Sequence, residues 1–276
     1  MIFTNEHRNN EIVQRLFLIF TSTLLFACCH QGNSGAAQND RKQDGLAGSV
    51  QSVRIETSKM IKQSGDYVEG PKEVVETRTY DAKGRMTEER YTAADDAPLY
   101  TARYLFDGDG RKKERGVYAP NETLRMKREF KYDDKEKLIE WSEYDADGSL
   151  RNKNIYAYGD DRQVSERTTF NAKGSLVDRW AYAYDESGNK KEETRYYADG
   201  SIDTRYVYTL DEKGNRIETT KYNAKDEAVG KESYAYEFDS NGNWVKRTTA
   251  LLIDSAGKTE AEPVEITYRK IQYRER

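Results

Sequence analysis

Cysteine and histidine are nearly missing from this chain. Its two cysteines are Cys28 and Cys29, its two histidines are His7 and His30, and residues 31–276 contain neither type. This absence excludes disulfides within the body of the protein and the common zinc sites built from cysteine and histidine. It also removes the side chain that most readily titrates near neutral pH. We therefore predict a protein that is not an enzyme and that holds no metal and no cofactor.

An excess of basic residues is missing as well. The chain has 45 lysines and arginines against 49 aspartates and glutamates, and the two signs are interspersed. A basic stripe is typical of nucleic-acid-binding proteins and a polybasic cluster of proteins that bind anionic lipids, so we predict neither. Hydrophobic residues make up only 36% of the chain, but 21 residues are tyrosine. Because a tyrosine ring packs while its hydroxyl reaches water, this composition predicts a thin, wide structure.

Long apolar runs are missing except for one, LFLIFTSTLLFA at residues 16–27. The run is shorter than the ~20 residues that span a bilayer. It follows Arg15 and ends on the small residue Ala27, which is the form of a secretory signal peptide. We therefore predict that residues 1–27 are a signal peptide and that the protein is exported. The alternative is a buried core helix, and a misplaced start codon would explain the long leader.

The stretch Leu25-Phe26-Ala27-Cys28 resembles the lipobox of bacterial lipoproteins. In that family the cysteine receives a lipid and becomes the mature N-terminus. The resemblance thus implies lipid attachment at Cys28 and anchoring at the bacterial outer membrane or cell surface. The residues that follow, up to residue 47, have the composition of a flexible tether, so we predict a tether over residues 28–47.

A repeat of 26 residues governs the rest of the chain. Its first column, aromatic or apolar, holds Tyr80, Phe106, Tyr132, Tyr158, Tyr184 and Leu210, and Phe238 follows after 28 residues. A second aromatic column holds Tyr104, Phe130, Tyr156, Tyr182, Tyr208 and Tyr234, and a third holds Thr92, Tyr118, Tyr144, Phe170, Tyr196 and Tyr222. A glutamate column holds Glu88, Glu114, Glu140, Glu166, Glu192 and Glu218.

Each unit contains two turn signals separated by strand-like alternation. The first signal is Asp-x-x-Gly, as in Asp81–Gly84 and Asp185–Gly188, in which glycine supplies the positive φ of a short hairpin loop. Apolar and polar residues alternate between the turns, as in residues 176–184. We therefore predict an all-β fold in which tandem antiparallel hairpins at residues 80–249 form one long twisted or curled sheet. Residues 48–79 and 250–276 are predicted to be capping strands.

The repeat units resemble the YD repeats of the RHS family. The resemblance is carried by Tyr184-Asp185-Glu186-Ser187-Gly188-Asn189, Phe238-Asp239-Ser240-Asn241-Gly242-Asn243, Tyr80-Asp81-Ala82-Lys83-Gly84-Arg85 and Leu210-Asp211-Glu212-Lys213-Gly214-Asn215. It covers about residues 75–250 and implies a short, lipoprotein-type member built of β-hairpin strips. The units that begin at Tyr132 and Tyr158 lack the glycine, and their turns are expected to differ.

Candidate binding residues are few. We interpret the glutamate column as a solvated, ion-paired face, because column members about 9.6 Å apart cannot share a calcium ion. The loop Asp107-Gly108-Asp109-Gly110 is interpreted as a plain turn, since it lacks the downstream glutamate of a calcium loop. Trp141 and Trp180 are our candidate ligand contacts. Trp180 shares its face with Tyr182 and is expected to be packed, whereas Trp141 lies opposite to Tyr144 in parity and is expected to be exposed.

These observations lead to three hypotheses about function. The first is a non-enzymatic envelope lipoprotein that binds an envelope protein or polysaccharide through a broad β-sheet. The second is an extracytoplasmic glycoside hydrolase, which needs only two carboxylates, although no pair stands out. The third is a structural or toxin-associated accessory protein.

Overall fold

The computed structural model describes residues 39–160, 163–255 and 258–275, which form one short helix and sixteen antiparallel strands. The helix is α2 (Asp40–Gln43). The strands are β1 (Val50–Gln63), β2 (Asp66–Tyr80), β3 (Met86–Ala93), β4 (Pro98–Phe106), β5 (Lys112–Tyr118), β6 (Leu124–Tyr132), β7 (Leu138–Asp145), β8 (Leu150–Tyr158), β9 (Val164–Asn171), β10 (Leu176–Tyr184), β11 (Lys190–Tyr197), β12 (Ile202–Leu210), β13 (Arg216–Tyr222), β14 (Ala228–Phe238), β15 (Trp244–Ser255) and β16 (Lys258–Tyr273).

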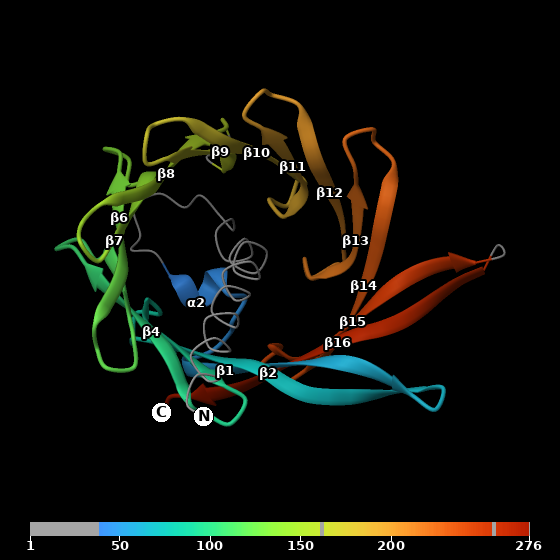
Figure 1. Cartoon of the computed structure of the whole chain (residues 1–276). Helices are drawn as coiled ribbons and strands as arrows, with labels where there is room; N and C mark the ends of the chain where they lie inside the picture. Colours follow the sequence, from blue (N-terminus) through green and yellow to red (C-terminus); the bar gives the residue numbers. More distant parts are fainter. Residues whose placement is uncertain (1–38, 161–162, 256–257, 276) are drawn as a thin grey trace, which may run out of the picture.

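The sheet closes on itself. Each strand pairs with the next, and β1 also pairs with β16, so the sixteen strands form a closed barrel (Figure 1). The closing pairs run from Val50 opposite Tyr273 to Lys59 opposite Glu265. The predicted all-β hairpin pattern is confirmed, but the prediction of one long twisted or curled sheet is wrong. Closure satisfies the backbone groups that an open sheet would leave at its two edges.

The Asp-x-x-Gly turns that start each repeat unit lie at one end of the barrel, which we call the Asp-turn rim; they begin at Asp81, Asp107, Asp185, Asp211 and Asp239. In the first of them the Asp81 carboxylate accepts a hydrogen bond from the backbone N–H of Arg85 at 2.9 Å, and Gly84 has a φ of +83°. The unit that begins at Tyr132, one of the two that lack glycine, keeps the same turn, because Glu136 adopts a φ of 64° and its N–H reaches the Asp133 carbonyl at 3.0 Å. The expectation of a different turn there is therefore wrong.

In four units, a tyrosine beside this rim ties the hairpin to the preceding one. Their phenols donate hydrogen bonds to main-chain carbonyls 20 residues earlier in the chain. The pairs are Tyr132 with Lys112 at 3.0 Å, Tyr158 with Leu138 at 2.8 Å, Tyr184 with Val164 at 2.9 Å and Tyr236 with Arg216 at 2.7 Å. The last pair uses Tyr236 instead of Phe238, so the hydrogen bond is kept although the preceding unit is two residues longer.

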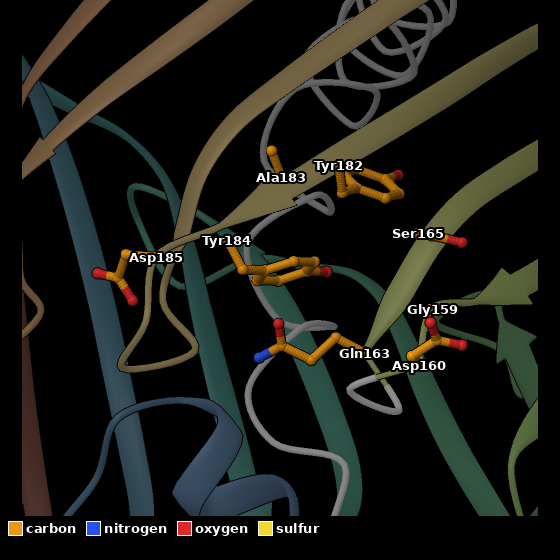
Figure 2. A pocket seen from close by; sticks show the side chains of 8 residues that line it. All are labelled: Gly159, Asp160, Gln163, Ser165, Tyr182, Ala183, Tyr184 and Asp185. Carbon is orange, nitrogen blue, oxygen red and sulfur yellow. The ribbon is translucent and has the colours of Figure 1, made fainter.

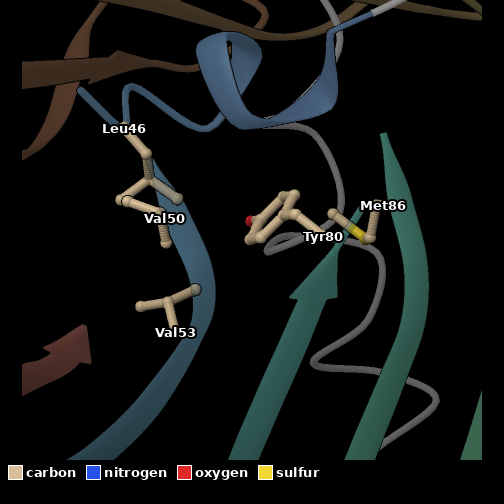
Figure 3. Close-up of a cluster of buried hydrophobic side chains, with 5 residues drawn as sticks. All are labelled: Leu46, Val50, Val53, Tyr80 and Met86. Carbon is tan, nitrogen blue, oxygen red and sulfur yellow. The ribbon is translucent and has the colours of Figure 1, made fainter. Parts of the chain in front are cut away.

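The hydrophobic core is small and lies to one side. Leu46, Val50, Val53, Tyr80 and Met86 form a buried cluster where the segment after α2 enters β1 (Figure 3). Elsewhere a sixteen-stranded barrel is too wide for side chains to fill, and barrels of this size enclose an aqueous interior. The thin apolar supply of the sequence therefore suits a hollow wall better than a solid core.

Candidate functional site: the inner wall of the barrel

The inner wall is identified by its contacts with α2, which lies inside the ring of strands (Figure 1). Lys112 on β5 reaches the Asp40 carboxylate at 2.6 Å, and its ammonium lies 4.6 Å from the ring of Tyr104. Paired residues on neighbouring antiparallel strands share a face. The column of Tyr104, Phe130, Tyr156, Tyr182, Tyr208 and Tyr234 therefore faces the lumen, and the column of Tyr118 and Tyr144 faces outward.

Both predicted ligand contacts, Trp141 and Trp180, lie on this inner wall. Trp180 is buried, with 8% of its surface exposed, as its shared parity with Tyr182 indicated. Trp141 is half-buried, and its indole N–H donates to the Tyr156 hydroxyl at 2.8 Å. The expectation that Trp141 is exposed is wrong, because it assumed that the column containing Tyr144 faces the packed side.

Arginines pair with the three tryptophans of the chain, a feature that we missed at the level of sequence. Arg128 lies 3.8 Å from the Trp141 ring, Arg167 and Arg195 lie 5.6 Å and 5.8 Å from the Trp180 ring, and Arg269 lies 3.6 Å from the Trp244 ring. Cations at such distances are attracted to the ring face. The two-residue period of a strand places Arg128 on the same face as Phe130 and Arg167 on the same face as Thr169. It could therefore have assigned both arginines to the inner wall.

Several inner-wall charges are buried and held by specific partners. Arg115 donates two hydrogen bonds to Glu89, at 2.6 Å and 2.9 Å. Burial raises the pKa of Glu89, but the neighbouring Arg115 outweighs it and holds that pKa below its usual value. Burial and then the nearby Arg78 lower the pKa of Arg269 to about 10. The wall is therefore a polar surface with fixed charges.

The segment around α2 contacts the inner wall at the Asp-turn rim. Asp40 accepts a hydrogen bond from the backbone N–H of Met86 at 2.7 Å. Asp44 pairs with Arg78 at 2.9 Å and accepts the hydroxyl of Tyr80. On the far side of the barrel seam, the Asn243 side chain accepts from the backbone N–H of Ala47 at 2.6 Å. Residues 39–47, predicted as the end of a flexible tether, thus partly cover this end of the lumen.

The outer wall is charged on nearly every hairpin. The glutamate column faces outward, and its cationic partners come from neighbouring strands. The pairs are Glu88 with Arg103 at 3.4 Å, Glu140 with Lys131 at 2.7 Å, Glu166 with Arg179 at 2.7 Å, Glu192 with Arg205 at 3.3 Å and Glu218 with Lys231 at 2.9 Å. Arginine also stacks outside, as Arg179 does at 4.1 Å from the Tyr196 ring. The outer wall therefore presents ion pairs on most hairpins.

A cavity of about 400 Å³ lies on the inner wall near the Asp-turn rim (Figure 2). Its lining includes Tyr182 and Tyr184 of β10 and Ser165 of β9. Tyr182 lies two residues from Trp180 on the same face of the strand, so the cavity and the Arg167–Trp180–Arg195 row share one stretch of wall.

Other kinds of site were sought in the same part of the chain. Among the residues that the structure describes, no three His, Cys, Asp or Glu side chains are grouped so that they could hold a metal ion. No helix within those residues is long and apolar enough to cross a membrane. The predicted signal peptide and Cys28 lie outside the described residues, so these expectations stay predictions.

Comparison with solved structures reveals a similar barrel. A porin-like protein from Bacteroides uniformis is 10% identical, with a TM-score of 0.54 over 82% of this chain and 98% of that chain. The chain shares that protein's fold. A porin-like protein from Bacteroides vulgatus (12% identity, TM-score 0.38, 82% and 98% covered) and the Tc holotoxin pore of Photorhabdus luminescens (12%, 0.22, 75% and 16%) are only weakly similar. No family model and no curated protein matches the sequence.

The closed fold changes the functional interpretation. The hypothesis of a protein that binds through a broad, open repeat sheet is wrong, because the sheet has an inner and an outer wall and no free flat face. Any site on the concave side is reached only through the ends of the barrel.

Proposed function

We propose that this protein is a non-enzymatic, pore-like barrel of the bacterial envelope. The barrel lies outside the bilayer and binds an oligosaccharide or polysaccharide in its lumen. The observation that carries the proposal is the contrast between the two walls. The tryptophans lie on the inner wall beside guanidinium groups, whereas the arginines of the outer wall stack on tyrosines and pair with the glutamate column. Aromatic rings with polar neighbours are suited to sugar rings, which have both apolar faces and hydroxyl edges.

The outer wall favours a barrel that does not span the bilayer. A transmembrane barrel needs an outward apolar band about 25 Å tall, and each lysine or arginine at the bilayer midplane costs about 2–4 kcal/mol. Lys131, Arg179 and Arg205 all project from the outer wall. The resemblance to porin-like proteins therefore extends to the fold, while the charges favour a barrel held at a membrane from outside it.

Support for an envelope location comes from the sequence. The leader over residues 1–27 favours export, and the lipobox-like stretch favours a lipid at Cys28 as the membrane anchor. We further propose that residues 80–249 are YD-type repeats of the RHS family. The 26-residue period and the recurring Asp-x-x-Gly turns support that assignment.

The contacts of α2 favour a lumen with one main entrance. Asp40 and Asp44 are buried and make charged contacts with Lys112 and Arg78, so the segment at the Asp-turn rim is fixed in place. A ligand then enters from the opposite rim.

The location of a bound ligand can be tested with the intrinsic fluorescence of the protein. All three tryptophans lie on the inner wall, so a sugar chain in the lumen is expected to change their emission in parallel with binding heat. Planar bilayers exposed to the protein are expected to show no channel conductance. A ligand that binds without altering the emission, or steady single-channel currents, would refute the proposal.

A further inference from the structure

The stretch of inner wall around Trp180 contains three buried polar atoms with unmet hydrogen bonds. They are the indole Nε1 of Trp180, the Oδ1 of Asp178 and the Nε of Arg167, none of which has a partner among the described residues. Asp178 and Trp180 are each only 8% exposed. Buried polar groups are nearly always hydrogen-bonded in proteins. Two buried donors and one buried acceptor without partners, at neighbouring positions of the paired strands β9 and β10, therefore indicate a ligand.

Charge distinguishes the two arginines that flank Trp180. Arg195 is neutralised, because it contacts Asp178 at 3.0 Å and Asp203 at 3.1 Å. Arg167, directly opposite Trp180 on β9, makes no ion pair with any residue that the structure describes. Arg167 is half-buried and faces the lumen. The Arg167 guanidinium group is therefore available to pair with a negatively charged group of a ligand.

The combination of groups specifies the chemistry of the ligand. A free guanidinium group binds a carboxylate through two parallel N–H bonds. The Asp178 oxygen accepts a hydrogen bond from a hydroxyl, and the indole N–H donates to a ring or hydroxyl oxygen. A compound with a carboxylate and several hydroxyls on one ring satisfies all three groups.

We infer that Arg167, Asp178 and Trp180 form a subsite for a carboxylate-bearing sugar, so that the lumen selects acidic over neutral sugar chains. The inference rests on the proposed function, since it assumes that the lumen takes up sugar rings. The same element recurs around the wall. The Nε atoms of Arg128 beside Trp141, and of Arg247 and Arg269 beside Trp244, also lack partners among the residues described. Repeated elements suit a ligand with repeated acidic units.

The decisive experiment compares tetragalacturonate with its methyl ester, which keeps the sugar rings and removes the charge. Calorimetry with the full chain is expected to show about ten- to a hundredfold weaker binding of the ester. Arg167→Gln is expected to weaken binding of the acid by a similar factor and leave binding of the ester unchanged. Asp178→Asn is expected to weaken both ligands, because both donate the same hydroxyls.

Arg179→Gln provides the matched control. Arg179 lies next to Trp180 on β10 but points outward, where it pairs with Glu166 at 2.7 Å, so its loss is expected to leave binding of the acid unchanged. Equal affinity for acid and ester, equal effects of Arg167→Gln on both, or an effect of Arg179→Gln as large as that of Arg167→Gln would overturn the inference. So would failure of tetragalacturonate to bind.

A panel of neutral oligosaccharides separates this inference from the proposed function. If a neutral sugar binds and shifts the tryptophan emission while tetragalacturonate does not bind, the lumen is a sugar site and only the acidic subsite is refuted. If no sugar in either set changes the emission, the proposed function fails as well.

Discussion

Replacement of Glu56 by glutamine is expected to weaken the seam at which the barrel closes. Glu56 on β1 is 2% exposed and is contacted by three cations from three strands. Lys72 of β2 lies at 2.5 Å, Arg54 of β1 at 2.8 Å and Lys270 of β16 at 3.0 Å. The carboxylate therefore links both neighbours of the strand that completes the ring.

The magnitude follows from the pKa of Glu56. Burial raises this pKa, but hydrogen bonds from Arg54, Lys72 and Lys270 outweigh burial and lower it from 4.5 to about 2. A shift of that size corresponds to about 3 kcal/mol of stability at neutral pH. Because the side chain of Lys270 is 63% exposed, solvent screening reduces the expected loss in Glu56→Gln to about 2 kcal/mol.

Urea unfolding at several pH values tests this expectation. A depressed carboxyl pKa contributes stability that is complete above pH 4.5 and is lost as the pH falls toward about 2. The difference in unfolding free energy between wild type and Glu56→Gln should therefore shrink over that interval. Glu260→Gln is the control, because its pair with Lys258 is exposed on a hairpin tip and is expected to contribute less than about 0.5 kcal/mol. Equal effects of both substitutions at pH 7, or a difference that stays constant with pH, would contradict the reasoning.

Three further substitutions probe other parts of the molecule. Asp44→Asn removes one of the two carboxylates that pair with Arg78, the other being Glu76, and is expected to cost about 2 kcal/mol, with faster hydrogen exchange over residues 40–47; unchanged exchange would show that α2 is held by other contacts. Cys28→Ser is expected to move the protein from the membrane fraction to the soluble fraction, and continued sedimentation with membranes would argue against a lipid there. Tyr236→Phe removes the phenol bond to a β13 carbonyl and is expected to lower stability by about 1 kcal/mol; the outward Tyr222→Phe serves as the control, and an equal loss there would refute the assigned role.

Local features of the fold were predictable from the sequence because they depend on neighbouring residues. The two strands per unit follow from the alternation around Trp180, and the turn at Asp81 follows from the glycine three residues later. Closure was not predictable, because it depends on Val53 pairing with Ile271 across the whole chain. The end segments lack the aromatic columns, so no repeat signal indicated that they meet.

The candidate site was only partly visible in the sequence. Trp141 and Trp180 stood out as rare residues, and both proved to line the lumen. Arg167 and Asp178 did not stand out, since 34% of the residues are charged. Their significance depends on which charges remain unpaired, and that depends on the register of β10 against β9 and β11.

The 26-residue repeat, with phenol bridges that join four of the hairpins to the preceding one, also bears on how such a barrel could change size. Because every 26-residue unit brings two strands, gain or loss of a whole unit keeps the strand number even and leaves the β1–β16 junction untouched. Barrel diameter grows roughly in proportion to strand number, so one unit would alter the bore by about one-eighth. Duplication or deletion within the gene could thus fit the opening to thicker or thinner chains while the ring stays complete.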